Sequence, residues 1–319
     1  MFGVAKTRRW MPILLAVAWL TGCVGGSSVP NGAAPTALFA AVRPSAQLYG
    51  NDWVYSAQPY GNNLAVYRRK GLTLTLKLTL SESISVPMGT VATPTGAWYV
   101  ANSGGFDVLV YRSTKDGPKG PDSTLQDSGE VPVNVSVTPN QQLVAVSNAT
   151  SIPSGTGSVS VYLNGTSQPS RILTYGNDLL VGSGVAIDPS GDCFWSFDDA
   201  SNPSAPGSIV EFSQCSGAGT LIASGLTQAG GIVFDQSGNL YYIDEAHGIY
   251  KCQQTSNCKL FATGFVLPIN LNFDAKQQHL WVADATGFID AVSPKTGAIE
   301  SQTISIDGDP YGVAPSPGS

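Results

Sequence analysis

Short apolar runs separated by polar turns follow one another along the chain, most clearly at residues 231–252, GIVFDQSGNLYYIDEAHGIYKC. Val, Ile, Tyr and Phe dominate the runs, and these residue types suit a pleated surface. The polar stretch 235–239 favours a tight reversal, because its Asp can bond nearby backbone and its Gly can adopt positive φ. The pattern predicts two strands joined by a turn, a loop that begins at Asp244, and a third strand at 248–251.

The same pattern occurs five times, and this repetition is the strongest signal in the sequence. The copies cover residues 89–102, 135–148, 184–198, 231–244 and 271–284. Their turns open with Thr93, Thr138, Asp188, Asp235 and Asp274, which lie 45, 50, 47 and 39 residues apart. The repeat is therefore one supersecondary unit of about 45 residues.

The two ends of the chain complete a sixth copy. Residues 312–318 match the first strand and turn, while 52–56 and 64–68 supply the second and third strands, with 52–56 aligned to 97–101. A repeat divided between the termini implies a ring whose first and last strands pair, which removes free sheet edges. The sequence predicts an all-β fold, a six-bladed β-propeller with N- and C-terminal strands closing one blade.

Residues 1–22 have the features of a signal peptide, because basic residues precede an apolar stretch at 11–20. The sequence LTGC at 20–23 resembles the lipobox of bacterial lipoproteins, in which the peptide is cut before a Cys that becomes lipid-modified. We therefore expect lipidation of Cys23. The alternative is an ordinary secretory signal that contains a Cys by chance.

The rest of the chain divides into a tether and one domain. Residues 23–45 are rich in Gly, Ala, Ser and Pro, which predicts a flexible tether. Residues 46–319 form the predicted propeller domain. We expect the protein in the bacterial cell envelope, attached to the membrane through its lipid, and in the outer membrane if the cell is Gram-negative.

The charge balance argues against nucleic acid as a partner and against a polybasic membrane-binding surface. The formal net charge is −6, and removal of the three basic residues of the signal peptide leaves 13 Lys and Arg against 22 Asp and Glu. Phosphate backbones need a basic surface, and no stretch interleaves basic with aromatic residues. We expect no nucleic-acid partner.

Four cysteines follow Cys23, and an even number in an exported protein favours disulfides. Four cysteines allow three pairings, of which the local one joins Cys193 to Cys215 and Cys252 to Cys258. The alternative is a metal site, which the absence of CxxC and the presence of only two histidines disfavour.

The repeat unit, with its Gly-[Ile/Val] start, Asp-x-x-Gly-Asn turn and closing Asp, resembles the NHL repeat and the six-bladed propellers of the SMP-30/gluconolactonase type. The likeness covers roughly residues 48–319, although Thr93 and Thr138 replace the turn Asp and Gln277–Gln278 replace the turn Gly. The resemblance implies the propeller fold. The resemblance also implies a candidate activity, that of a metal-dependent lactonase, because such propellers use a central cation held by Glu, Asp and Asn.

One polar residue ends the second strand of each copy and would lie near one face of the ring. These residues are Asn102, Asn148, Asp198, Asp244 and Asp284. One interpretation is a cluster of oxygen ligands for a divalent cation such as calcium. The favoured interpretation is structural, because a short polar side chain at a strand end bonds nearby backbone.

No motif identifies a catalytic centre, since GxSxG, HExxH and phosphate-binding loops are all missing. His247 and Glu245 could form an acid–base pair, but a solvated loop histidine is favoured, and His279 is expected at the surface of a turn. The large aromatic residues at strand positions are expected to pack between blades. These are Trp98, Trp195, Tyr241, Tyr242 and Trp281.

Two function classes follow. The first is a non-catalytic binding module of the cell envelope, whose partner is an envelope protein, a glycan or a small ligand, with no cofactor. The second is a metal-dependent lactonase or hydrolase of the SMP-30-like type, with a cation such as calcium in the ring. The missing nucleophile and the scarcity of histidine favour the first.

Overall fold

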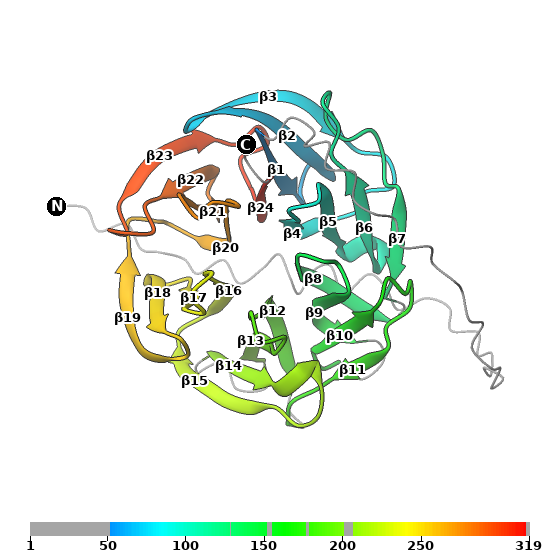
Figure 1. Cartoon of the computed structure of the whole chain (residues 1–319), viewed down its shortest axis with the longest axis vertical. Helices are drawn as coiled ribbons and strands as arrows, with labels where there is room; N and C mark the ends of the chain where they lie inside the picture. The colour runs from blue at the N-terminus through cyan, green and yellow to red at the C-terminus, as the bar shows by residue number, and fades with distance from the viewer. Residues whose placement is uncertain (1–51, 128, 152–154, 177–178, 201–206, 317–319) are drawn as a thin grey trace, which may run out of the picture. The chain divides into compact units, whose positions relative to one another are not determined.

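Each repeat folds into one four-stranded antiparallel sheet, and six such sheets surround a central axis as the blades of a propeller (Figure 1). The computed structural model describes residues 52–127, 129–151, 155–176, 179–200 and 207–316. The predicted six-bladed β-propeller is therefore confirmed. The predicted signal peptide, Cys23 and the tether lie outside the described residues. Among the described residues, no helix has the length and apolar character needed to cross a membrane.

The blades are numbered in chain order, and the innermost strand of each is given first. Blade 1 contains β24 (Gly312–Pro315), β1 (Trp53–Gln58), β2 (Asn63–Lys70) and β3 (Thr73–Leu80). Blade 2 contains β4 (Pro87–Ala92), β5 (Ala97–Asn102), β6 (Asp107–Arg112) and β7 (Ser123–Gln126). Blade 3 contains β8 (Glu130–Val137), β9 (Leu143–Ser151), β10 (Ser158–Leu163) and β11 (Arg171–Leu173).

The other three blades follow the same order. Blade 4 contains β12 (Leu180–Ile187), β13 (Cys193–Asp199), β14 (Gly207–Phe212) and β15 (Thr220–Leu226). Blade 5 contains β16 (Ala229–Phe234), β17 (Leu240–Asp244), β18 (Gly248–Gln253) and β19 (Ser256–Ala262). Blade 6 contains β20 (Pro268–Phe273), β21 (Leu280–Asp284), β22 (Phe288–Val292) and β23 (Ile299–Ile304). Two short 3-10 turns, η1 (Ser103–Gly105) and η2 (Ser213–Cys215), lie outside the sheets.

Blade 1 closes the ring as predicted, because β24 pairs with β1 from Gly312 opposite Ala57 to Pro315 opposite Val54. The alignment of residues 52–56 with 97–101 is wrong by one position. The N–H of Trp53 donates to Ser316 Oγ at 3.0 Å, as the N–H of Ala97 donates to Thr93 Oγ1 at 3.1 Å. Trp53 therefore occupies the place of Ala97 rather than that of Trp98.

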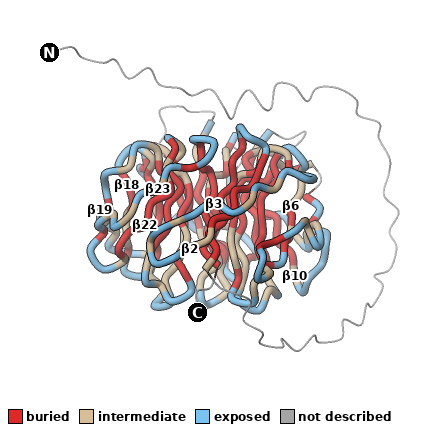
Figure 2. The backbone as a smooth tube through the Cα atoms, turned by 90° about the horizontal axis from the view of Figure 1, so that it is seen from above, coloured by how far each residue is buried: buried red, intermediate tan, exposed pale blue. Residues whose placement is uncertain are grey.

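Large aromatic side chains fill the spaces between neighbouring blades, as predicted. Trp98, Trp195 and Trp281 are each at most 1% exposed, and Trp98 stacks on Tyr55 of blade 1 with ring centroids 4.2 Å apart. Burial of one such side chain contributes on the order of 3 kcal/mol. Figure 2 shows the buried strands through the middle of the domain, with exposed segments at its two faces and its rim.

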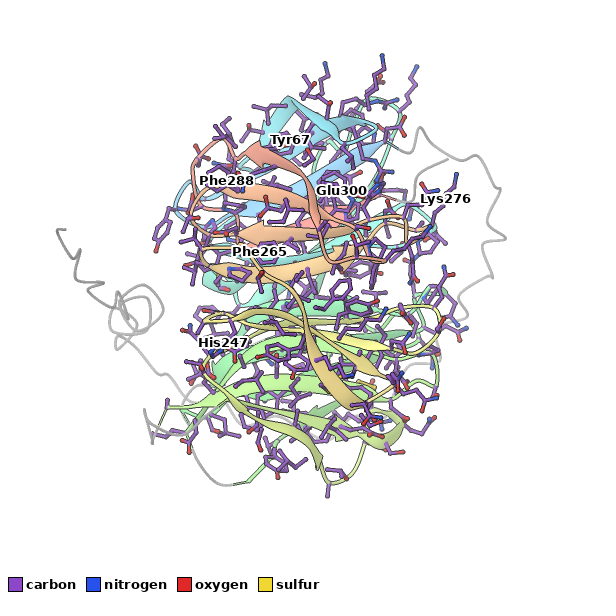
Figure 3. All side chains as sticks on the ribbon, turned by 90° about the vertical axis from the view of Figure 1, so that its left-hand side faces the viewer. Tyr67, His247, Phe265, Lys276, Phe288 and Glu300 are labelled. Carbon is purple, nitrogen blue, oxygen red and sulfur yellow. A yellow bond between two sulfur atoms is a disulfide. The ribbon has the colours of Figure 1, made fainter. Side chains whose placement is uncertain are left out.

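The two faces of the propeller carry different loops. The upper face, as we call it, carries the loops from the second to the third strand of each blade and the connections between blades. The lower face carries the turns from the first to the second strand and the loops from the third to the fourth. In Figure 3, His247 and Phe288 of the upper face lie on the opposite side from Lys276 of the lower face.

Both predicted cysteine pairs are joined. Cys193 of β13 bonds to Cys215 of η2, and Cys252 of β18 bonds to Cys258 of β19. Each disulfide links neighbouring segments of one blade on the lower half of the molecule, so neither joins two blades.

Candidate functional site

Four of the five polar residues predicted at the second-strand ends occupy equivalent positions at the upper face. Each lies opposite a residue near the start of the innermost strand of its own blade, and each such strand has a register shift nearby. The pairs are Asn102 with Pro87, Asn148 with Pro132, Asp244 with Ala229, and Asp284 with Pro268. The repeat therefore places four polar side chains at one height around the ring.

Asp198 departs from this arrangement by one residue. In blade 4 the equivalent position belongs to Phe197, which pairs with Gly182, while Asp198 pairs with Val181. Asp198 Oδ1 accepts a hydrogen bond of 2.9 Å from the N–H of Ala229 at the start of blade 5. Asp198 therefore bonds to the next blade, whereas Asn102, Asp244 and Asp284 accept bonds from the connections that lead into their own blades.

The sixth member of the ring is Gln58, which the sequence alignment missed. The one-residue correction in blade 1 places Gln58 at the position of Asn102. Gln58 is fully buried, its Nε2 donates to Ser56 Oγ at 2.7 Å, and its Oε1 has no hydrogen-bond partner among the described residues. The signal that could have found it is the Ser316–Trp53 pairing expected from the Thr93–Ala97 turn.

Asp284 and Asp244 hold the backbone of the loops around them. Asp284 accepts bonds from the N–H groups of Val266, Leu267 and Thr286 at 2.7, 3.1 and 3.0 Å. Asp244 accepts from the N–H groups of Thr227 and Ala246 at 3.1 and 3.2 Å. Such bonds support the structural interpretation of these two carboxylates.

Asn102 has the same function in blade 2. Its Oδ1 accepts a bond of 2.6 Å from the N–H of Ser85, and its Nδ2 donates to Asp107 Oδ1 at 2.7 Å. Burial raises the pKa of Asp107, and the bond from Asn102 opposes that rise. The amide thus joins the two loops that meet at the upper end of the blade.

Asn148 lies instead at the centre of a buried polar network between blades 2 and 3. Its Nδ2 donates to Ser158 Oγ and Ser160 Oγ at 3.0 and 2.9 Å. Those hydroxyls donate in turn to Glu130 Oε2 and Asp127 Oδ1, both at 2.6 Å. Burial raises the pKa of Asp127 to about 6, against the opposing hydrogen bonds of its neighbours.

Carboxyl groups of neighbouring blades lie near Glu245 on the upper face. Glu245 follows Asp244 in the loop 245–247, and Asp198 of blade 4 is close enough for its charge to act on Glu245. Burial raises the pKa of Glu245 well above its ordinary value, and the charges of Asp198 and Asp244 add to the rise. Glu245 Oε2 is shielded from solvent and has no hydrogen-bond partner among the described residues.

Two further upper-face carboxyl groups have raised pKa values. Burial raises the pKa of Asp198 to about 6, with a further contribution from Asp244 and an opposing one from the N–H of Ala229. Burial likewise raises the pKa of Asp309 to about 6, although the N–H of Tyr60 donates to its Oδ2 at 3.1 Å. Asp198 belongs to blade 4, and Asp309 lies in the connection that leads into blade 1.

His247 is largely exposed, as the favoured interpretation of the sequence expected, and it lies against Asp244 rather than Glu245. Its Nδ1 lies 3.0 Å from Asp244 Oδ2 and 3.5 Å from Thr227 Oγ1, and its side chain is 53% exposed. Both neighbours face the same ring nitrogen. A Ser–His–Asp type of centre needs the nucleophile and the acid on opposite nitrogens, so this histidine is not arranged as its base.

His279 lies on the lower face and is less exposed than predicted. Its Nδ1 is 3.1 Å from Asp274 Oδ2 and its Nε2 is 3.6 Å from Glu300 Oε2, with 24% of the side chain exposed. Asp274 also pairs with Arg69 at 3.3 Å. These contacts place His279 in an ion-pair network that joins blades 6 and 1.

No three His, Cys, Asp or Glu side chains of the described residues are grouped closely enough to hold a metal ion. The side-chain oxygens of Asn102, Asp244 and Asp284 instead accept bonds from loop backbone. Gln58 Oε1 and Asn148 Oδ1 have no hydrogen-bond partner among the described residues. A cation held by these side chains alone would need the carboxyl groups near Glu245 to move toward one another.

The upper face carries no Lys or Arg within the described part of the chain. Of the 16 basic residues, only Lys6, Arg8, Arg9 and Arg43 lie outside the described residues. None of the others falls in an upper-face loop such as 81–86, 245–247, 285–287 or 305–311. The carboxyl groups of the upper face therefore have no Lys or Arg side chain in the described loops around them.

Solved structures of other proteins share the fold of this chain. No known family profile matches the chain, and no curated protein sequence does. A functionally unknown protein from Desulfotomaculum acetoxidans is similar in structure, with a TM-score of 0.58 and 11% identity over 84% of this chain and all of that one. The calcium-binding protein regucalcin from Agrobacterium tumefaciens gives a TM-score of 0.54 and 12% identity, over 72% of this chain and 77% of that one. At such identities the likeness shows the fold alone.

Proposed function

We propose that this chain is an exported, lipid-anchored propeller that binds a positively charged partner on its upper face and catalyses no reaction. The observation that carries the proposal is Glu245, whose Oε2 is shielded from solvent without a hydrogen-bond partner among the described residues, near Asp198 and with no Lys or Arg in the described upper-face loops. A shielded carboxyl group without a cationic neighbour favours a ligand that supplies the missing charge. A basic segment of an envelope protein or a small amine has this chemistry.

The proposal implies that binding releases protons. Glu245 has a raised pKa in the free protein, and a cation beside it would favour the ionised form. A short oligolysine peptide is therefore expected to bind more tightly as the pH rises. Calorimetry in buffers of different ionisation enthalpy measures the protons released.

The variant Glu245→Gln should bind this peptide about fivefold more weakly and release fewer protons, the loss of one charge contact of about 1 kcal/mol. Glu300→Gln on the lower face is the matched control and should leave binding unchanged. Equal affinity and equal proton release in wild type and Glu245→Gln would contradict the proposal.

The lipid anchor is tested separately. Wild-type protein should fractionate with membranes and incorporate labelled fatty acid. Cys23→Ser should do neither, because the thiol that receives the lipid is gone. A variant that still incorporates fatty acid would show that the lipobox interpretation is wrong.

A second candidate function is a metal-dependent lactonase or hydrolase with its cation near Glu245. The carboxyl groups of Asp198 and Asp244 near Glu245 favour it, and the described calcium binding of the regucalcin neighbour suggests the ion to test. Calcium would then raise the melting temperature as its concentration increases, and a chelator would lower it. The same changes should be absent from Asp198→Asn and Glu245→Gln.

A further inference from the structure

The exposed basic side chains lie on the half of the molecule where the polypeptide enters the propeller. β1 begins with Trp53 at the lower face, opposite Arg68 and next to Ser316, so the chain that precedes Asp52 joins the domain there. The polypeptide therefore enters the described domain at the lower face of blade 1. This placement follows from the direction of β1 and not from the structure of the tether.

Lysines flank this point on the lower faces of blades 1, 2 and 6. Lys70 ends β2, Lys115 and Lys119 lie in the loop 113–122 of blade 2, and Lys276 and Lys295 lie in two lower-face loops of blade 6. All five are exposed. We call these five residues the basic arc.

The acids of the lower face compensate this charge only in part. The turn carboxylates of Asp188 and Asp235 each accept two backbone N–H bonds, from residues two and four positions further on. On the lower face of blades 1, 2 and 6, Asp52, Asp122 and Asp274 pair with Arg68, Arg112 and Arg69. Asp116 and Glu300 are the other acids there, against the five lysines of the basic arc. A net positive strip thus remains around the point of chain entry, although the whole chain is acidic.

We propose that the basic arc lies against an anionic lipid surface, so that the anchored propeller rests on its lower face with the upper face turned away from the membrane. The proposal rests on the lipid anchor of the proposed function for its setting. Lysines within a Debye length of anionic headgroups are attracted to them. A membrane fits better than a free anion because the arc surrounds the chain's point of entry and is spread over three blades rather than gathered in one pocket.

The test uses the full-length Cys23→Ser chain, which carries no lipid, so that the face is measured without the anchor. It is mixed with vesicles of phosphatidylcholine, with or without phosphatidylglycerol, and co-sedimentation is measured at low and high salt. We expect binding only to the anionic vesicles, weakening as salt rises. Equal binding to both kinds of vesicle, or to neither, would overturn the proposal.

Substitution of the arc tests which residues are responsible. Adding Lys70→Gln, Lys115→Gln and Lys119→Gln should weaken vesicle binding roughly fivefold for each lysine removed. Lys259→Gln, on the outer strand of blade 5, is the matched control and should change binding less than twofold. If the control weakens binding as much as an arc substitution, only net charge matters and the proposed orientation is wrong.

Hydrogen exchange on the same samples reports the orientation. The amides of 113–122 should exchange more slowly when anionic vesicles are added, while those of 285–287 on the upper face should not change. Protection of the upper loops instead would overturn the proposal. So would binding to soluble polygalacturonate without binding to vesicles, which would assign the arc to an acidic polysaccharide. Failure of fatty-acid labelling would refute the anchor alone, because the vesicle experiment uses unlipidated protein.

Discussion

Asp290 is predicted to destabilise the protein at neutral pH. It lies in the middle of β22, is fully buried, and neither carboxyl oxygen has a hydrogen-bond partner among the described residues. Gln302 lies on the neighbouring strand β23 opposite it. Burial raises the pKa of Asp290 from 3.8 to about 6, the amide of Gln302 opposes the rise, and the charge of Asp284 adds to it.

The size and sign of the effect follow from proton linkage. A pKa raised by about two units corresponds to about 3 kcal/mol, taken as an upper bound. The folded protein binds the proton more tightly than the unfolded chain, so stability is lost as the pH rises from about 4 to about 6. Above about pH 6 both states are ionised and the full cost remains.

Asp290→Asn keeps the shape and removes the charge. The variant should be more stable than wild type at neutral pH, by up to about 3 kcal/mol, and should show a shallower fall in stability between about pH 4 and pH 6. Denaturant unfolding across this range measures both quantities. The slope will not vanish, because Asp127, Asp198 and Asp309 have pKa values raised in the same direction.

Asp284→Asn is the matched control in the same blade. Asp284 accepts bonds from three backbone N–H groups and from Thr286 Oγ1 at 2.6 Å, so its charge is stabilised where that of Asp290 is not. The control should lose about 1–3 kcal/mol of stability. A loss of stability in Asp290→Asn at neutral pH, equal to that of the control, would refute the reasoning.

Three further predictions concern closure, disulfides and the polar ring. A chain ending at Asp309 lacks β24 and leaves the inner edge of β1 unpaired, so it should be insoluble or melt many degrees lower; melting within a degree or two of wild type, by calorimetry, would contradict ring closure. Replacing Cys252 and Cys258 by Ser should cost about 2 kcal/mol in denaturant unfolding, because the loop they close is short; an unchanged midpoint would count against a formed disulfide. Asn102→Ala and Asp284→Ala should each cost about 0.5–1.5 kcal/mol and add in the double variant; a combined cost well below the sum would instead indicate a shared ligand.

The fold could be predicted because side-chain alternation and turn chemistry repeat in each blade. The Asp235 turn has Gly238 at φ 78°, and the longer turns of blades 3 and 6 use Gln141 and Gln277 at φ 59° and 52° in the corresponding left-handed conformation. Loss of the turn Gly therefore lengthens the turn without removing the blade. Turn residues and the alternation of side chains can be recognised in a single sequence.

The register of blade 1 was not predictable from the same features. Trp53 and Trp98 look equivalent, but side chains alternate between two sides of a strand, and a shift of one residue exchanges them. Hydrogen bonds of the turn at Ser316 decide the register. Because blade 1 was aligned one residue out of register, Gln58 was not recognised as the sixth residue of the polar ring.

An error of one residue in strand register also affected the prediction of the candidate site. Asp198 was assigned to the ring because it ends an apolar run, yet Phe197 holds that position and packs beside Trp195, with ring centroids 4.6 Å apart. In the sequence, Glu245 was considered only as a neighbour of His247. Its position near Asp198 depends on how blades 4 and 5 pack together, which no local pattern in the sequence specifies.

The proposed orientation on the membrane bears on the chemistry of the upper face. The second strand of blade 2 has 6 residues, which at about 3.4 Å per residue separates the two faces by about 20 Å. That distance is about twice the Debye length in physiological salt, roughly 8–10 Å. An anionic membrane attracts protons to its surface, so carboxyl groups with pKa values of about 6, such as Asp198 and Asp309, would be partly neutralised if the upper face lay against it. In the orientation that we propose, the lysines around the point of chain entry would keep that face at a distance where Asp198 and Asp309 are mostly ionised at neutral pH and open to a cationic partner.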